Sequence, residues 1–294
     1  MFRLSVISDE VSQDPLVVAR FCREFGMQGV EPRSVWDKPP QELTDDDAKR
    51  LRDLFAEEGV AVCAIASPFF KCDYGNADQR AQHLAILRRC IALGRLLGTD
   101  LIRGFVFWQT GRTEEIWPDL VGEYAEPVRI LEGEDAYIGI ENEASTSIAS
   151  AALLRRFLDD LGSPRVRAIW DPGNEAYYKD GEAPYPDGYN RVKDLIIHVH
   201  IKDCTREGTP GGGESVPIGE GLVDWPGQLG ALLDDRYEGY ASLETHWRPK
   251  HVLSEAAVVR PGGSAFSEAG EEASRICMQN LLRFLEEAKA QRGL

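Results

Sequence analysis

The feature that most constrains the fold is a regular alternation of short apolar runs and amphipathic segments along the whole chain. Short apolar runs are typical of buried strands, whereas leucine and isoleucine at helical spacing over 77–97, closed by Gly98, indicate a helix. We expect helices at 14–25, 44–59, 77–97, 113–131, 147–158 and 225–233, and a last one around 277–285. We expect strands at 4–7, 29–30, 60–66, 100–107, 136–140, 166–170, 196–203 and 239–243.

About eight strands alternating with about eight helices predict an α/β protein with a single (β/α)8 TIM barrel. No linker or charge run divides the chain, so we expect one domain over 1–294, with loops 204–222 and 248–266 as insertions at the barrel mouth. A doubly wound open sheet is the alternative. It would carry a glycine fingerprint after the first strand, and SVISDEVSQD has none.

Composition excludes several classes of partner. The net charge of −16 repels polyanions, so we expect no nucleic acid and no membrane as partner. Six cysteines show no CxxC spacing, and the start of the chain has no signal-peptide pattern. The sequence therefore predicts reduced thiols and a cytoplasmic location.

Acidic and basic residues follow nearly every predicted strand, at the end where such barrels place catalytic groups. Parity indicates that several of them point into the barrel, because alternate residues of a strand share a face. Glu141 shares its face with Gly139, and Glu244 shares its face with Ser242. The inward set at four adjacent strand ends is Glu141, Asp171, His200 and Glu244.

Three carboxylates in one pocket repel each other unless a cation neutralises them. One imidazole with oxygen donors suits one divalent metal ion, namely Mn, Mg, Co or Zn. The alternative is a structural ion-pair network with Arg33, Lys71, Arg103 or Lys202. His198 points the same way as His200 but lies one pleat deeper, so we expect it to be a packed, hydrogen-bonded residue.

The strand-end segments YIGIENE, IWDPGN, IIHVHIKD and YASLETHW resemble those of the xylose-isomerase-like TIM-barrel superfamily of sugar phosphate isomerases and epimerases. The resemblance covers essentially the whole chain, since SDEVSQD, VEPRSVW, ASPFFK and PIGEGLVDW also fit it. It implies that the four inward residues are the metal ligands and that Glu141 and Glu244 are the catalytic acid/base pair. It also implies that this chain, like many barrels of the group, forms a homodimer.

The same resemblance gives Arg206, six residues after His200, a contact with substrate. One departure is Asn174, since ketose epimerases of this group often carry a histidine three residues after the metal aspartate. Arg248, Lys250 and Arg260 follow the last strand, where barrels often hold phosphate. The residues predicted to bind substrate are Arg206, Lys202, Asn174, Glu31, Lys71, His246 and Trp108.

These observations predict a metal-dependent isomerase or epimerase of a small keto-sugar or sugar phosphate. Its glutamates would move a proton through an enediolate that the metal stabilises. The alternative on the same site is a dehydratase of a keto-polyol such as an inosose. A non-catalytic sugar-binding barrel is a weaker alternative. An endonuclease-IV-like phosphodiesterase would need many more histidines than the five present.

Overall fold

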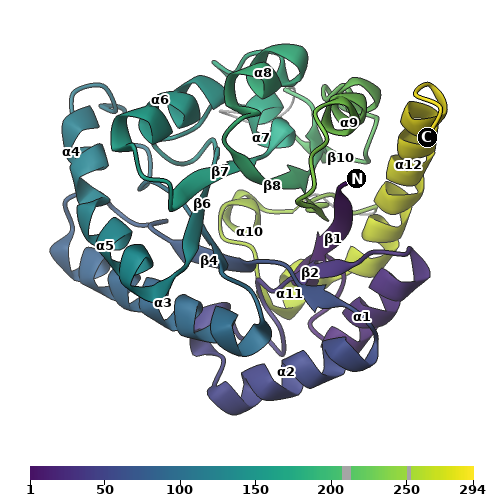
Figure 1. The fold of residues 1–294 in the computed structure, drawn as a ribbon, viewed down its shortest axis with the longest axis horizontal. Helices are drawn as coiled ribbons and strands as arrows, with labels where there is room; N and C mark the ends of the chain where they lie inside the picture. Colours follow the sequence, from purple (N-terminus) through teal and green to yellow (C-terminus); the bar gives the residue numbers. More distant parts are fainter. Residues whose placement is uncertain (207–212, 250–252) are drawn as a thin grey trace.

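The computed structural model describes residues 1–206, 213–249 and 253–294, and it confirms the predicted α/β barrel. Parallel strands pair in the order β3-β2-β1-β11-β8-β7-β6-β5-β4, with the helices outside them (Figure 1). These strands are β1 (Arg3–Ile7), β2 (Gly29–Glu31), β3 (Ala61–Val62), β4 (Ile65–Phe69), β5 (Leu101–Gly104), β6 (Tyr137–Glu141), β7 (Val166–Trp170), β8 (Ile196–Ile201) and β11 (Tyr240–Leu243).

The third strand closes the barrel in two parts. β3 pairs with β2 and β4 pairs with β5, so one short segment joins the two ends of the sheet. The single strand predicted at 60–66 is therefore wrong in its bounds, because it breaks after Val62 and resumes at Ile65. The Cys63 amide still bonds to the Val30 carbonyl at 2.9 Å across the break.

The outer layer consists mainly of the predicted helices. They are α1 (Pro15–Glu24), α2 (Asp45–Glu57), α3 (Ala77–Leu97), α4 (Trp117–Glu123), α5 (Ala125–Glu134), α6 (Ala151–Leu161), α9 (Trp225–Asp234) and α12 (Gly270–Ala290). The single helix predicted at 113–131 is two helices, α4 and α5. The helix after β6 starts three residues later than predicted, because Ser150 rather than Ser147 caps its first turn. Short helices that were not predicted include α7 (Pro172–Tyr177) and α8 (Tyr189–Val192).

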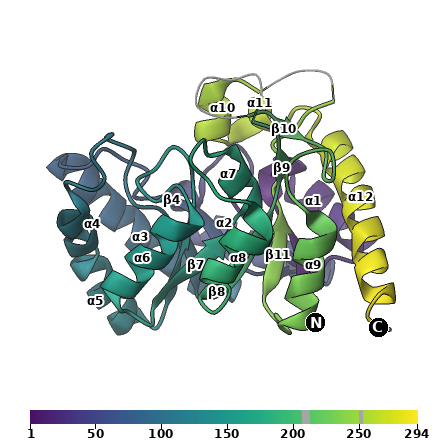
Figure 2. The ribbon, with the colours of Figure 1, turned by 90° about the horizontal axis from the view of Figure 1, so that it is seen from above.

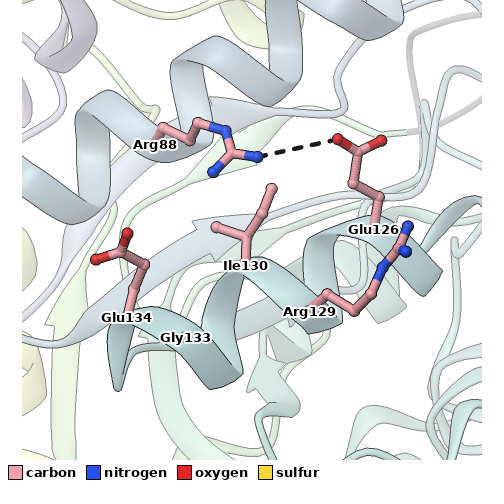
Figure 3. Close-up of a pocket in the computed structure, with 6 residues that line it drawn as sticks. All are labelled: Arg88, Glu126, Arg129, Ile130, Gly133 and Glu134. Carbon is pink, nitrogen blue, oxygen red and sulfur yellow. Dashed lines mark ion pairs between the residues drawn. The ribbon is translucent and has the colours of Figure 1, made fainter.

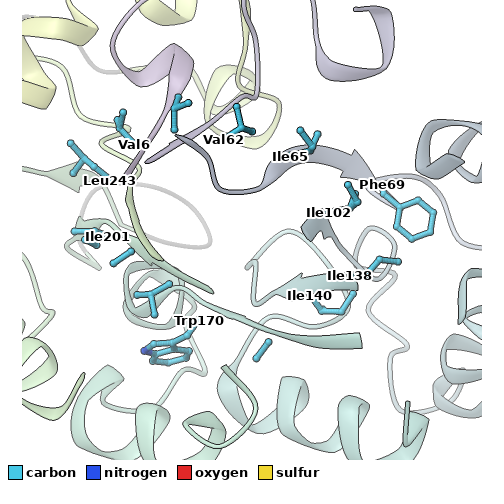
Figure 4. Close-up of a cluster of buried hydrophobic side chains, with 14 of the residues drawn as sticks. Val6, Val62, Ile65, Phe69, Ile102, Ile138, Ile140, Trp170, Ile201 and Leu243 are labelled. Atoms are coloured by element: carbon cyan, nitrogen blue, oxygen red, sulfur yellow. The ribbon is translucent and has the colours of Figure 1, made fainter. Parts of the chain in front are cut away.

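Large apolar side chains fill the space between strands and helices. Ile138 and Ile140 of β6 belong to this layer, as do Ile201 of β8 and Leu243 of β11 (Figure 4). Trp170 also lies there and donates a hydrogen bond to Gln228 of α9 at 2.9 Å. Alternate residues of the same strands must point into the barrel, and those near the carboxyl ends are mostly small or polar.

Short elements lie over the carboxyl ends of the strands. α10 (Glu255–Val259) and α11 (Gly263–Ser267) lie at one end of the barrel and the two termini at the other (Figure 2). Neither helix was predicted: α10 lies within the segment 248–266 that was predicted as an insertion, and α11 extends one residue beyond it. The other insertion, 204–222, contains part of the hairpin of β9 (Asp203–Cys204) and β10 (Ser215–Val216). The parts 207–212 and 250–252 of these loops lie outside the described residues. No helix in the described part of the chain is long and apolar enough to cross a membrane.

Candidate metal centre

The four predicted ligands meet at the carboxyl ends of four adjacent strands. Among the described residues, Glu141, Asp171, His200 and Glu244 each offer one ligand atom, and these atoms lie within 4.8 Å of one another. All four residues are buried, with at most 2% of their surface exposed. The structure thus brings together the set that strand parity selected.

Backbone geometry explains how two of these side chains are aimed. Glu141 ends β6 and shares its face with Gly139, where an added Cβ would lie 2.5 Å from the Ile169 side chain. Ile169 therefore fills the barrel interior beneath the site, and Asp171, two residues later, points the same way. Asp171 also caps α7, because its Oδ1 accepts the Asn174 amide at 2.9 Å.

Asn142 fixes the distance between the ends of β6 and β7. Its side-chain Nδ2 donates to the Asp171 carbonyl and its Oδ1 accepts the Asp171 amide, both at 2.9 Å. This reciprocal pair holds the Asp171 backbone against the strand that carries Glu141. Sequence reasoning did not single out Asn142, although its position directly after Glu141 was visible.

The imidazole of His200 lies at the middle of the cluster. Its Nδ1 is 3.2 Å from Glu141 Oε1 and 3.5 Å from Glu244 Oε2. Its Nε2 points the other way, toward Glu31 Oε2 at 3.2 Å. His198 is buried beneath it and contacts Glu31 Oε2 at 3.1 Å and Ser242 Oγ at 2.9 Å, in keeping with the predicted packed role.

Three cations pair with the carboxylates of the site. Lys202 Nζ lies 2.9 Å from both Asp171 Oδ2 and Glu244 Oε2. Arg103 Nη1 spans Glu141 Oε2 at 3.2 Å and Glu244 Oε1 at 3.7 Å. Arg33 Nη1 lies 2.7 Å from Glu244 Oε1. The ion pairs of the alternative interpretation therefore exist, except that Lys71 pairs with Glu143 instead.

The charges of the site shift its pKa values in opposite directions. Burial is the largest single effect on Glu141 and would raise its pKa, but the charge and hydrogen bond of His200 together with Arg103 outweigh it, and the pKa falls to about 2. Burial likewise opposes ionisation of Glu244, yet Lys202 and His246 hold its pKa well below the usual range. Asp171 differs, because burial outweighs the attraction of Lys202 and raises its pKa to about 6.

The donor set fits a divalent ion. Three carboxylates and one imidazole are the ligand types of oxygen-rich Mn, Mg, Co or Zn sites. Asp171 Oδ2 is fully buried and accepts no hydrogen bond from any described residue, although Lys202 Nζ is close. A buried carboxylate oxygen without a hydrogen bond is an available ligand atom.

Three residues predicted to contact substrate lie against the predicted metal ligands themselves. Asn174 Nδ2 donates to Glu141 Oε1 at 3.1 Å. Glu31 holds the two histidines from below, as described above. His246 Nδ1 lies 3.0 Å from Glu10 Oε1 and 3.7 Å from Glu244 Oε1. These contacts place all three at the site.

The other predicted substrate residues lie nearer the mouth or outside it. Lys71 Nζ contacts Glu143 Oε2 at 3.2 Å and donates to the Val259 carbonyl of α10 at 3.1 Å. Trp108 is half-buried, and Arg260 lies over its ring at 5.3 Å from the centroid. Arg206 is exposed, and its guanidinium donates to the carbonyls of Ala176 and Gly181 at 2.6 and 3.1 Å.

The basic residues considered for phosphate binding are largely occupied. Arg248 is buried and donates to the carbonyls of Trp247, Phe266 and Glu268. It also lies 3.4 Å from Glu10 Oε2. Lys250 lies outside the described residues.

A surface pocket elsewhere does not belong to this site. It has a volume of about 400 Å³ and lies between α3 and α5 in the outer helical layer (Figure 3). Its lining is charged and includes Arg88 and Glu126, whose side chains approach to 4.0 Å. None of its lining residues lies at a strand end.

Fold and site together define a TIM-barrel protein with a buried carboxylate–histidine cluster at the carboxyl ends of its strands. The sequence profile of the xylose isomerase-like TIM-barrel family matches residues 19–273. The chain belongs to this family.

Solved structures with the same fold agree with this assignment. The IolI protein with a bound zinc atom aligns with a TM-score of 0.73 and 18% identity over 98% of this chain and 99% of that one. L-ribulose 3-epimerase aligns with 0.70 and 17% identity over 100% and 97%. The probable 3-DHS dehydratase AsbF of Bacillus anthracis aligns with 0.69 and 16% identity over 91% and 98%. No curated protein sequence matches the chain, and identities this low show the fold alone.

Proposed function

We propose that this protein is a divalent-metal-dependent isomerase or epimerase of a small keto-sugar or its phosphate. The observation that carries the proposal is that His200 Nδ1 and Arg103 Nη1 each contact both Glu141 and Glu244. Two glutamates therefore flank one small region that also contains Asp171. Family membership supports an enzyme, and the epimerase and dehydratase among the structural neighbours have the same fold.

The residues that would hold the ion are Glu141, Asp171, His200 and Glu244. When bound, it would polarise the substrate carbonyl and neutralise the developing oxyanion. The low pKa values of Glu141 and Glu244 keep both carboxylates ionised at neutral pH. Either one is therefore ready to accept a proton.

Proton transfer at the carbon next to the carbonyl then follows from the two glutamates. One carboxylate takes the proton from that carbon, and the electron pair of the broken C–H bond moves into the enediolate. If the same glutamate returns the proton to the neighbouring carbon and the hydroxyl proton moves from one oxygen to the other, the carbonyl changes place and the product is the isomer. If the other glutamate has first taken a proton from solvent, it delivers that proton to the opposite face of the original carbon and the centre is inverted. The first glutamate then releases the proton that it removed to solvent.

Lys202 and Arg103 complement this chemistry by charge. Both are buried beside the glutamates, where a fixed cation lowers the energy of an anion that forms in the reaction. Lys202 contacts Asp171 and Glu244 rather than Asp203 or Glu143, so its ammonium group lies within the cluster. We assign both cations to orienting the substrate and stabilising the enediolate.

Hydrogen exchange in heavy water tests the proposal. The protein, loaded with Mn²⁺, is incubated with ketoses, ketose phosphates and inososes, and products are followed by proton NMR and mass spectrometry. For one of these compounds we expect solvent deuterium at a carbon next to the carbonyl and no loss of water. Loss of water from an inosose would identify a dehydratase instead. Absence of exchange with every compound would contradict enediolate chemistry.

Two conservative variants separate catalysis from binding. Glu141→Gln and Glu244→Gln keep the shape of each side chain but cannot accept a proton. Loss of exchange in both, with each variant still folded at the assay temperature, is expected for an acid/base pair. A non-catalytic sugar-binding barrel predicts instead that both variants bind sugar as the wild type does.

A further inference from the structure

Glu31 lies beneath the metal centre and contacts two histidines with one oxygen. Its Oε2 is 3.1 Å from His198 Nε2 and 3.2 Å from His200 Nε2, and all three side chains are buried. Glu31 ends β2, whereas the histidines come from β8, so the contact crosses the interior of the barrel. Sequence reasoning grouped Glu31 with the substrate-binding residues, but its Oε2 contacts His200, a predicted metal ligand, and His198.

We propose that Glu31 is a positioning residue that keeps the proton of His200 on Nε2, so that Nδ1 is the atom that binds the metal. The inference rests on the proposed metal centre and deepens it. It names the ligating nitrogen and the residue that selects it. His198 then holds Glu31 in place and does not bind the metal itself.

The donor and acceptor properties of Glu31 and His200 determine where the hydrogen lies. An ionised carboxylate only accepts hydrogen bonds, whereas a neutral imidazole has one N–H donor and one lone pair on the other nitrogen. Facing Glu31 Oε2, His200 Nε2 must carry the hydrogen. Nδ1 faces Glu141 Oε1 at 3.2 Å and Glu244 Oε2 at 3.5 Å, so in the metal-free protein it carries a hydrogen as well. An ion bound among Glu141, Asp171 and Glu244 would take the place of the Nδ1 hydrogen, and the Nε2 hydrogen would stay on Glu31. A carboxylate behind a histidine ligand fixes its tautomer and ring orientation in this way.

A column of hydrogen bonds holds Glu31 in turn. His198 Nε2 lies 2.9 Å from Ser242 Oγ, which is 2.7 Å from Ser5 Oγ. The two imidazole rings are perpendicular, with centroids 5.5 Å apart. Glu31 Oε1 receives no hydrogen bond from the described residues, so the two histidines set the direction of the carboxylate through Oε2.

The geometry also poses a clear alternative. Within the described chain, Glu31, His198 and His200 form a second group whose ligand atoms lie within 4.8 Å of one another. Both groups contain His200, but they approach opposite nitrogens of its ring. Our proposal requires ligation through Nδ1, whereas a metal in the lower group would be bound through Nε2 of both histidines. The ligating nitrogen therefore decides between them.

One experiment reads that nitrogen directly. The full chain is labelled with 15N-histidine, stripped with chelator and loaded with 113Cd²⁺, and His198→Gln identifies the signals of the second histidine. We expect 113Cd–15N coupling to Nδ1 of His200, a proton on its Nε2, and no coupling to His198. Coupling to Nε2 of His200 or to His198 would overturn the proposal.

Affinity for Mn²⁺ supplies an independent test by calorimetry. Glu31→Gln should weaken binding about 10- to 100-fold, as expected for loss of a ligand's supporting carboxylate. Asp9→Asn is the matched control, because Asp9 is also a buried carboxylate at this end of the barrel but pairs with Arg33 rather than a histidine. Its affinity should stay near that of the wild type.

The outcomes are distinguishable. Equal losses in Glu31→Gln and Asp9→Asn would mean that net charge matters and positioning does not, and undiminished binding in Glu31→Gln would exclude the role of Glu31. In either case the metal centre itself would stand. A wild type that binds neither Cd²⁺ nor Mn²⁺ would overturn the metal centre and the role of Glu31 together. If Glu31→Gln fails to fold, the coupling in the wild type still decides.

Discussion

Replacing Lys202 with methionine probes the balance of charge in the site. The Lys202 ammonium lies 2.9 Å from Asp171 Oδ2 and from Glu244 Oε2, and all three side chains are buried. Methionine keeps most of the side-chain volume but removes the cation. Asp171 would then lack its cationic partner and Glu244 would lose one of its cationic partners, so in the metal-free protein we expect a marked loss of stability.

The magnitude follows from general values. Removing one partner of a buried ion pair costs about 3–5 kcal/mol. An unfolding entropy of about 2.1 cal/mol/K per residue gives roughly 0.6 kcal/mol/K for a chain of 294 residues. The melting temperature of Lys202→Met should therefore fall by about 5–8 °C. A divalent ion at one hundred times its dissociation constant should restore about 2.7 kcal/mol, or roughly 4 °C.

The assay is thermal unfolding followed by circular dichroism at pH 8, in chelator and then in Mn²⁺. In the wild type this pH lies above the Asp171 pKa of about 6, so the ion pair between Asp171 and Lys202 is formed. Lys71→Met is the control, because Lys71 pairs with Glu143 near the mouth and not with the cluster. A Lys202→Met protein as stable as the wild type in chelator, and indifferent to Mn²⁺, would refute the reasoning.

Three further predictions concern residues with separate roles. Glu141→Gln and Glu244→Gln should each abolish deuterium exchange into substrate, as NMR would show. Each also removes one partner of buried ion pairs, so the melting temperature should fall by about 5–8 °C, as for Lys202→Met, and circular dichroism should show that both variants are folded at the assay temperature. Burial raises the pKa of Asp9 from 3.8 to about 6, so the folded state holds this proton more tightly and stability is lost as pH rises through 6. The free energy of unfolding of Asp9→Asn, measured in urea titrations, should therefore gain about 1.4 kcal/mol relative to the wild type between pH 5 and pH 8. A difference between the two proteins that does not depend on pH would contradict this. Asn142→Ala should lower the free energy of unfolding by about 1–3 kcal/mol in the same titrations, because it leaves the buried amide and carbonyl of Asp171 without their side-chain partner. A cost near zero would show that these two hydrogen bonds are not needed for stability.

The fold was predictable because it depends on local patterns. Periodicity and capping residues mark the strands and most of the helices, and the alternation of strands with helices indicates the fold class, an α/β barrel. The errors fall where local patterns are ambiguous. The run Val60–Ala66 is apolar throughout, so nothing in it marks the break after Val62 that lets the barrel close. Ser147 and Ser150 are both good caps, and only the second has its side chain bonded to a helical amide.

The ligand cluster was predictable for the same reason, since parity and strand order place Glu141, Asp171, His200 and Glu244 at one mouth. Their partners were not. Arg103 spans two glutamates that lie 38 and 141 positions further along the chain, and Glu31 meets histidines 167 and 169 positions away. Such contacts depend on how far strands are staggered around the barrel, which a single sequence does not encode in any local pattern.

Metal binding by the purified protein tests the central claim most directly. Chelator-stripped protein is titrated with Mn²⁺ by calorimetry, beside Asp171→Asn, which retains the size of the side chain but loses its charge. We expect the wild type to bind one ion per chain and to melt at a higher temperature when loaded, and we expect Asp171→Asn to bind at least about 10-fold more weakly. A wild type that takes up no Mn²⁺, Zn²⁺, Co²⁺ or Mg²⁺ and melts at the same temperature with and without them would contradict the metal centre and leave the cluster as an ion-pair network.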